Sequence, residues 1–122
     1  MMITAYRDII NKIGKVEDAP FGYALSLISG KWKLVILYLL SGGQPIRFNE
    51  LRRRVGKITY KMLSDQLKQL EKDDLIIRKE YPQVPPKMEY SLSERGESLL
   101  PILYAMCDWG HSHQPKRLEG AE

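Results

Sequence analysis

Hydrophobic residues recur along this chain at two spacings, one helical and one alternating. In residues 4–13 they fall three or four positions apart, which predicts an amphipathic helix. The face that they form consists of Tyr6, Ile9, Ile10 and Ile13. A helix this short is marginal by itself, so it must dock against another surface. Residues 21–29 predict a second short helix, with Pro20 in its first turn and an end at Gly30.

The middle of the chain predicts a buried helix followed by a pair of amphipathic helices. Residues 32–40 are hydrophobic nearly all round, which indicates a helix inside the core. Residues 48–55 and 60–72 then form two helices, separated by a break at Gly56. Thr59 is a suitable N-cap for the second of them. Their inward faces are Phe48, Leu51 and Val55 in the first, and Leu63, Leu67 and Leu70 in the second.

Three extended segments follow from the remaining patterns. Residues 45–46 suit a brief extended piece before the helix pair. Residues 75–81 are rich in β-prone side chains, and residues 87–92 alternate as a strand does. The prolines between them cannot continue a helix or a central strand, so we expect a hairpin with a proline-rich loop.

Residues 93–109 predict a last helix, which Ser93 caps. Pro101 should kink it near Glu97, because the carbonyl of that residue loses its amide partner. The helix carries two hydrophobic stripes, and two stripes favour burial against a partner subunit, since a helix that covers only its own domain needs one. The stripes are Leu99, Ile102, Leu103 and Met106, and Leu100, Tyr104 and Cys107. The residues expected at a homodimer interface are Tyr6, Ile9, Ile10, Ile13, Leu100, Leu103, Tyr104 and Cys107.

This order of elements predicts a winged helix-turn-helix, a mainly α fold with a small β-hairpin wing, dimerising through its N- and C-terminal helices. Two consecutive helices with a tight turn, followed directly by a hairpin, are typical of that architecture. Its second helix enters the major groove of DNA and the first braces it. We expect one domain over residues 1–122. Its parts are an N-terminal dimerisation helix (1–18), a core (19–92), a C-terminal dimerisation helix (93–110) and a polar, frayed tail (111–122).

The positive charge of the chain is concentrated on the predicted helix pair. Residues 47–72 contain eight basic and three acidic side chains, a net charge of +5, whereas the other 96 residues carry −1. The whole chain is therefore only mildly basic, at +4. A charge run is often no more than the solvated face of a helix. Here it coincides with the two helices that would meet DNA, so we favour nucleic-acid binding.

The outward face of the second helix offers candidate groove contacts. Lysine and serine contacts reach phosphate more often than base edges. Asp65 could accept a hydrogen bond from a cytosine amino group, or simply neutralise a neighbouring lysine. Tyr60 could meet a phosphate or a thymine methyl, or pack on the first helix. The residues of this outward face are Lys61, Ser64, Asp65 and Lys68.

Further contacts are expected on both sides of that face. Adjacent arginines on a helix point about 100° apart, so one or two should reach DNA and the others should pair with acids or solvent. The wing residues could approach the flanking minor groove or remain an exposed loop. The complete set expected to contact DNA is Arg47, Arg52, Arg53, Lys57, Thr59, Tyr60, Lys61, Ser64, Asp65, Lys68, Gln83 and Lys87, with Arg54 and Val84 as neighbours.

The composition excludes several other classes of protein. With 43% hydrophobic and 28% charged residues, the chain is typical of folded domains. The longest apolar run, residues 34–40, is far shorter than the roughly 20 residues of a membrane span. No secretory signal is recognisable, so we expect a cytoplasmic protein without membrane contact.

Enzymatic and metal chemistry find no support in the residues. There is no nucleophile paired with a base, no recognisable carboxylate pair and no glycine loop for phosphate, so we expect no enzyme and no cofactor. The single cysteine excludes an internal disulfide framework. The spacing of Cys107, His111 and His113 fits no strong zinc pattern, and an inert buried thiol is the usual outcome for such a cysteine.

Several sequence blocks resemble one known family. Gly30-Lys31-Trp32, RFNELRRRV at 47–55, KMLSDQLKQLE at 61–71, LIIRKEYPQVPPKMEYSLSERG at 75–96 and LLPIL…MCDWG at 99–110 occur here in order. They are similar to the HxlR (DUF24) family of bacterial winged-helix transcription regulators, which is related to the MarR group. The resemblance covers about residues 19–110 and implies a homodimeric regulator at a promoter operator.

Two positions depart from the pattern of that family. Many members carry a redox-sensing cysteine where this chain has Ala19, before Pro20. Alanine forms no thiolate or disulfide, so the resemblance carries no thiol switch to this position. Asp74 stands where a glycine commonly follows the recognition helix, and the site predicts a left-handed backbone.

We therefore expect a sequence-specific, homodimeric repressor that binds an inverted-repeat operator in double-stranded DNA. A small-molecule effector remains open. The alternative is a winged-helix module for protein interaction, which would bind DNA weakly and form a stable hetero-complex. The +5 segment argues against that alternative.

Overall fold

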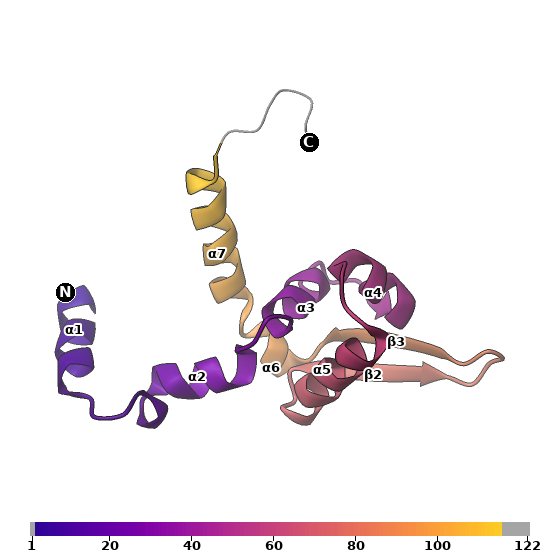
Figure 1. The fold of residues 1–122 in the computed structure, drawn as a ribbon, viewed down its shortest axis with the longest axis horizontal. Helices are drawn as coiled ribbons and strands as arrows, with labels where there is room; N and C mark the ends of the chain where they lie inside the picture. The colour runs from indigo at the N-terminus through magenta and orange to yellow at the C-terminus, as the bar shows by residue number, and fades with distance from the viewer. Residues whose placement is uncertain (1, 116–122) are drawn as a thin grey trace.

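Helices and short strands follow the predicted order in the computed structural model, which describes residues 2–115 (Figure 1). The first half contains α1 (Met2–Lys12), the 3-10 turn η1 (Val16–Asp18), α2 (Pro20–Ile28), α3 (Lys33–Leu40), β1 (Ile46–Arg47) and α4 (Phe48–Val55). The second half contains α5 (Tyr60–Lys72), β2 (Ile76–Tyr81), β3 (Lys87–Leu92), α6 (Glu94–Glu97) and α7 (Leu100–His113). This is the expected winged helix-turn-helix, mainly helical with a small antiparallel sheet.

The core gathers around α3, which is apolar on nearly every side. Its residues Ile36, Leu37 and Leu40 are buried, and α4 and β3 pack against the helix. From α4, Leu51 enters the same core. The predicted inward stripe of α5 is buried as expected and consists of Leu63, Leu67 and Leu70. The helix pair is therefore fixed to the core by one face, and its other face is left to solvent.

The sheet contains three antiparallel strands in the order β1–β3–β2. β2 and β3 form the predicted hairpin, in which Tyr81 lies opposite Lys87 near the tip. Figure 1 shows this hairpin projecting from the molecule as a wing. The sequence predicts only a brief extended piece near residue 46. In the structure this piece is a strand, with Ile46 opposite Tyr90, and both residues are buried.

The end of α5 is tied to α6 through a small network around Leu75. Asp74 has φ +59°, the left-handed conformation predicted for this position. The hydroxyl of Ser93 donates to the carbonyl oxygen of Asp74 at 2.6 Å and accepts from the N–H of Gly96 at 2.9 Å. A Cβ atom on Gly96 would overlap the carbonyl oxygen of Leu75, so only glycine fits there.

The predicted last helix is divided into two, so the prediction of a single kinked helix is wrong. α6 ends at Glu97 and α7 begins at Leu100, with Pro101 in its first turn. The break falls where the sequence places the kink, because the proline leaves the Glu97 carbonyl without an amide partner. A proline fits the first turn of a new helix better than the interior of an old one.

α7 is longer than the sequence predicts, since it continues through Gly110 to His113 instead of fraying. A glycine inside a helix costs about 1 kcal/mol, so its helical conformation needs support from neighbours. The ring of His113 stacks on Trp109 with centroids 4.1 Å apart, and its Nδ1 lies 2.8 Å from the Trp109 carbonyl oxygen. Residues 116–122 of the predicted tail lie outside the described residues.

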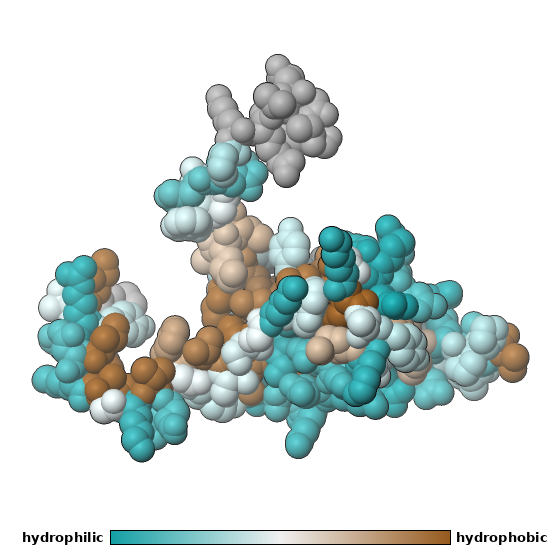
Figure 2. All heavy atoms as spheres, in the orientation of Figure 1, coloured by the Kyte–Doolittle hydropathy of each residue, from teal (hydrophilic) through white to brown (hydrophobic). Residues whose placement is uncertain are grey.

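Two parts of the chain protrude from the rest (Figure 1). We call residues 33–97 the body, and residues 2–28 and 100–113 the arms. Figure 2 shows hydrophobic surface on the arms and mostly hydrophilic surface over the body.

Within residues 2–115 no single helix is long and apolar enough to cross a membrane. Helices α2 and α3 together reach the necessary length and apolar composition, but the chain bends by 80° between them.

Candidate nucleic-acid interface

The turn between α4 and α5 fixes the two helices relative to each other. Gly56 has φ +103°, a conformation that glycine adopts without strain. Ile58 is buried, and its N–H donates to the Gly56 carbonyl at 2.8 Å. Arg52 closes the turn, because its Nε donates to the carbonyl oxygen of Ile58 at 3.2 Å. Arg52 is one of the predicted DNA contacts. Its Nε atom holds the turn, and its terminal guanidinium nitrogens remain available for a phosphate.

α5 begins with a capped and stacked end. Thr59 is the predicted N-cap, and its Oγ1 accepts from the N–H of Met62 at 3.0 Å. The ring of Tyr60 packs on Phe48 of α4, with centroids 4.7 Å apart. Tyr60 is still 58% exposed. Packing on the first helix therefore leaves more than half of Tyr60 accessible to DNA.

The outward face of α5 is polar. Lys61 and Lys68 are exposed, and Ser64 and Asp65 are half-exposed. Lys61 Nζ lies 3.0 Å from a carboxylate oxygen of Asp65, and both side chains are well solvated. Of the two roles that the sequence suggests for Asp65, the structure without DNA shows the neutralisation of a neighbouring lysine. An exposed pair of this kind contributes little stability, so a phosphate or base can displace it. Lys68 forms no ion pair with any residue between 2 and 115.

The cations of α4 divide between internal contacts and solvent, as their spacing predicts. Arg53 grips the carboxylate of Glu50 with two nitrogens, the Nε–Oε1 distance being 3.1 Å. These hydrogen bonds lower the pKa of Glu50 and raise the pKa of Arg53. Arg47, Arg54 and Lys57 are exposed, and in the described part of the chain no acid pairs with them. These three cations, on α4 and directly beside it, are therefore in contact with solvent.

Tyr81 organises the wing. Its hydroxyl donates to the carboxylate of Glu89 at 2.9 Å, and this hydrogen bond is the main reason that the pKa of Glu89 is lowered. The Nζ atom of Lys87 pairs with the same carboxylate at 3.3 Å and lies 4.4 Å from the centre of the Tyr81 ring. Only 22% of the Lys87 side chain is exposed. Lys87 is therefore held within the wing, whereas Gln83 and Val84 at the tip are exposed.

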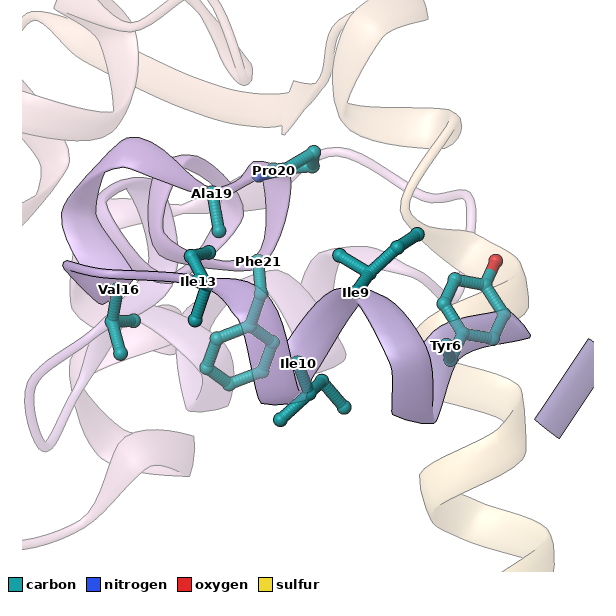
Figure 3. Close-up of a pocket in the computed structure, with 8 residues that line it drawn as sticks. All are labelled: Tyr6, Ile9, Ile10, Ile13, Val16, Ala19, Pro20 and Phe21. Carbon is teal, nitrogen blue, oxygen red and sulfur yellow. The ribbon is translucent and has the colours of Figure 1, made fainter. Parts of the chain in front are cut away.

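A hydrophobic hollow of about 640 Å³ lies between α1 and the start of α2 (Figure 3). Its lining consists of Tyr6, Ile9, Ile10, Ile13, Val16, Ala19, Pro20 and Phe21. Four of these are the residues that the sequence predicts at an interface between subunits. Figure 3 shows Tyr6, Ile9 and Ile10 on the helix and Ile13 in the loop after it. The single chain leaves this space open to solvent.

The predicted interface residues of α7 are not equally accessible. Tyr104 and Cys107 are exposed and Leu100 is half-buried. Leu103 is only 4% exposed and belongs to the core of its own chain, so we remove it from the predicted interface. The expectation of a buried thiol is wrong for the single chain, because Cys107 is exposed. Between residues 2 and 115, no three His, Cys, Asp or Glu side chains are placed to share a metal ion.

The sequence patterns did not predict one polar contact. Arg95 of α6 donates from Nη2 to the hydroxyl of Tyr23 in α2, a residue 72 positions earlier. Helical or alternating periodicity reports which face of an element is buried, but not which distant element it meets. No local pattern around Arg95 therefore predicts Tyr23 as its partner.

Sequence comparisons place this chain among regulators. A family model described as HxlR-like helix-turn-helix matches residues 27–118. The HTH-type transcriptional regulator BH0655 of Halalkalibacterium halodurans is 62% identical over 103 residues, which cover 84% of this chain and 91% of that protein. The HTH-type transcriptional regulator YdzF of Bacillus subtilis is 52% identical over 101 residues, covering 83% and 93%.

Solved structures agree with the sequence comparisons. The redox regulator HypR in its oxidised form superposes with a TM-score of 0.74 and 44% identity, covering 80% of this chain and 100% of HypR. A transcriptional regulator of the MarR family from Porphyromonas gingivalis W83 gives a TM-score of 0.77 and 39% identity, covering 84% and 98%. Fold and sequence therefore point to the same class of protein.

Proposed function

Since the chain belongs to the HxlR-like helix-turn-helix family of DNA-binding transcriptional regulators, we propose that it is a homodimeric repressor of an inverted-repeat operator. The observation that carries this proposal is the outward face of α5. Lys61 and Lys68 stand there on a helix whose opposite face is fully buried, beside the exposed cations of α4. Within the described residues, these two lysines take no part in the packing of the core.

In this proposal α5 lies in the major groove and α4 braces it against the DNA backbone. Lys61 and Lys68 meet phosphates or guanine edges, and Asp65 accepts from a cytosine amino group once Lys61 has moved to the DNA. Arg47 and Lys57 meet phosphates on either side. The remaining contacts come from Arg52, Arg53, Thr59, Tyr60, Ser64, Gln83 and Lys87, of which Arg53 and Lys87 must first loosen their own ion pairs.

In this proposal the arms form the interface between the two subunits of the dimer. The hollow beside α1 and the exposed side chains of α7 are apolar surfaces that a second copy would cover. The single domain then divides into dimerisation parts at 1–18 and 93–110 around a DNA-binding core at 19–92. A symmetric dimer presents two α5 helices to two half-sites about 34–36 Å apart, or a multiple of that spacing.

Repression follows from occupation of the promoter, in the cytoplasm where that DNA lies. An effector that changes the spacing of the two α5 helices would release the operator, because both must fit their half-sites together. The similar protein HypR is described as a redox regulator. We do not extend that chemistry to this chain at position 19, since Ala19 cannot be oxidised.

A gel-shift assay tests the proposal with DNA from the intergenic region upstream of the gene for this protein. The chain should bind an inverted repeat in that DNA more tightly than random DNA of the same length, at moderate salt. Equal affinity for both DNAs would refute the operator. Weak DNA binding with a stable hetero-complex in a pull-down would instead favour a protein-interaction module.

A further inference from the structure

One hydrophobic side chain at the start of α5 stays outside the core. Met62 is 41% exposed, and it is not among the hydrophobic residues that pack against the core from its edge. It lies in the first turn of α5, where its N–H donates to Thr59 at 3.0 Å. A methionine is flexible and apolar, so Met62 offers an adaptable hydrophobic contact beside the polar outward face of the helix.

Met62 and Gln66 form a row along one side of α5. They are four positions apart and therefore neighbours on the helix surface, and the amide nitrogen of Gln66 lies 3.9 Å from the sulfur of Met62. Successive residues of a helix point about 100° apart, so Lys61 lies between Met62 and Tyr60. Tyr60 packs on α4. The row of Met62 and Gln66 is therefore on the side of the outward face that is turned away from α4.

A helix in the major groove presents both of its sides to the DNA. An α-helix with its side chains is about 10–12 Å across, and the major groove of B-DNA is about 12 Å wide. Side chains beside the outward face therefore reach base edges, as do those at its centre. In a helix-turn-helix the N-terminal residues of the second helix contact the bases. Met62 and Gln66 lie in the first two turns of α5, on the side that α4 leaves free.

We propose that Met62 and Gln66 together recognise one A·T base pair in each half-site of the operator. A glutamine amide matches adenine, because its carbonyl oxygen accepts from N6 and its N–H donates to N7. The contact with Met62 uses one of the two N–H groups of the amide and leaves the other for N7. The side chain of Met62 covers the methyl group of the paired thymine, which is apolar and lies in the same groove. This inference rests on the proposed function, which places α5 in the major groove.

Two changes to the DNA test the base pair. The DNA is a duplex that the full chain selects from random sequences, and fluorescence anisotropy measures its affinity. Deoxyuridine in place of thymine removes only the methyl group, and at one thymine of the half-site it should weaken binding about fourfold, as expected for one buried carbon. 7-Deazaadenine in place of the paired adenine removes only the N7 acceptor and should weaken binding about fivefold. The proposal is wrong if no base pair of the half-site is sensitive to both changes.

Two variants assign these effects to their side chains. Met62→Ala should bind thymine and deoxyuridine DNA equally, whereas Met62→Leu keeps an apolar contact and should retain part of the difference. Gln66→Ala should bind adenine and 7-deazaadenine DNA equally. Gln114→Ala, an exposed position at the end of α7, is the control and should retain both differences.

Each comparison is a ratio between two DNAs on one protein sample, so a loss of folded protein in a variant cancels. A methyl effect that survives in Met62→Ala, or an N7 effect that survives in Gln66→Ala, would assign the base to another residue and overturn the proposal.

The outcomes separate this contact from the proposed function. A selection that returns no preferred sequence would contradict the operator itself, and with it the base contact. A preferred sequence that is indifferent to the thymine methyl and to the adenine N7 would leave the operator intact and overturn only the contact by Met62 and Gln66.

Discussion

The body and the arms contain the same kinds of hydrophobic residue but bury them to opposite degrees. Ile36 in α3 is 0% exposed, whereas Ile10 in α1 is 63% exposed, and both are isoleucines on helices. In the body, α4, α5 and the sheet surround α3 and cover it. In the arms, no buried residue occurs in α2 and only Leu103 is buried in α7. Apart from Leu103, the buried hydrophobic core within the described residues comes from the body, and most hydrophobic side chains of the arms stay outside it.

The difference separates two meanings of a hydrophobic pattern. A periodic face predicts that a helix is covered, but not by what. For α5 the cover is the same chain, and its three leucines are buried as predicted. For α1 the periodic face instead borders an open hollow. An exposed apolar patch of this kind is typical of an interaction site, so the arms are where we expect a partner to bind.

The largest effect should come from the core of the body. Leu37→Ala removes a fully buried side chain and should lower the free energy of unfolding by about 2–5 kcal/mol, measured by urea denaturation. Val35→Ala is the matched control on the same helix, where the residue is 38% exposed, and should cost much less. Equal losses at the two positions would contradict the buried placement of this face of α3.

The next effect should appear in association and leave the fold intact. Ile10→Glu places a charge in the hollow beside α1 and should weaken the dimer by at least about thirtyfold, the effect of losing about 2 kcal/mol at an interface. Analytical ultracentrifugation measures the change. Asn11→Glu puts the same charge next to the lining and should have little effect. A dimer that tolerates Ile10→Glu would exclude this hollow from the interface.

A smaller effect is expected for one lysine on the surface of the body that we propose to face DNA. Lys68→Ala should leave the thermal stability nearly unchanged, because the side chain is exposed and unpaired within the described residues. If Lys68 meets a phosphate, operator affinity should fall and the slope of its salt dependence should decrease by about 1. Lys15→Ala, in the loop after α1 and away from α5, is the control. Normal operator binding by Lys68→Ala would remove this residue from the interface.

The smallest effect concerns acid and the wing. The pKa of Glu89 is lowered from an ordinary value of 4.5, mainly by the hydrogen bond from Tyr81. A lowered pKa means that the carboxylate stabilises the fold above that ordinary value, and that this contribution is lost as the pH falls through the lower value in the folded state. Glu89→Gln should therefore melt below the unmodified chain at neutral pH, with the gap narrowing in acid. A gap that stays constant between pH 7 and acid would rule out the ionised carboxylate of Glu89 as its source.

The sequence predicted those parts of the fold that depend on local patterns. The bounds of α4, the cap at Thr59 and the left-handed Asp74 follow from neighbouring residues, and the structure confirms all three. The division between α6 and α7 falls close to Glu97, where the sequence places a kink caused by Pro101, but the sequence predicts one kinked helix and not two. A proline removes one hydrogen bond in either case, so Pro101 by itself does not decide between a kink and a break.

The candidate site also has a part that the sequence predicts and a part that it does not. The outward position of Lys61 and Lys68 follows from the helix period and is found in the structure. The internal roles of Arg52 and Lys87 could not be predicted, because each depends on a carbonyl or ring brought near by a turn or a hairpin register. The hydrogen bond from Arg95 to Tyr23 depends on the approach of α6 to α2, which no local pattern contains. Sequence therefore predicts which side chains face outward better than what they meet.

The close approach of Gly96 to Leu75 has a consequence for how mutations of this protein will be read. Every substitution at this position adds at least a Cβ atom where the Leu75 carbonyl oxygen already lies. A saturation screen scored by reporter-gene repression would find position 96 as intolerant as a residue that touches DNA. Yet glycine has no side chain with which to bind anything. Intolerance at position 96 would reflect the close packing of α6 against the segment after α5, and not a contact with DNA. Only a parallel measurement of protein abundance would distinguish a loss of folded protein from a loss of DNA recognition.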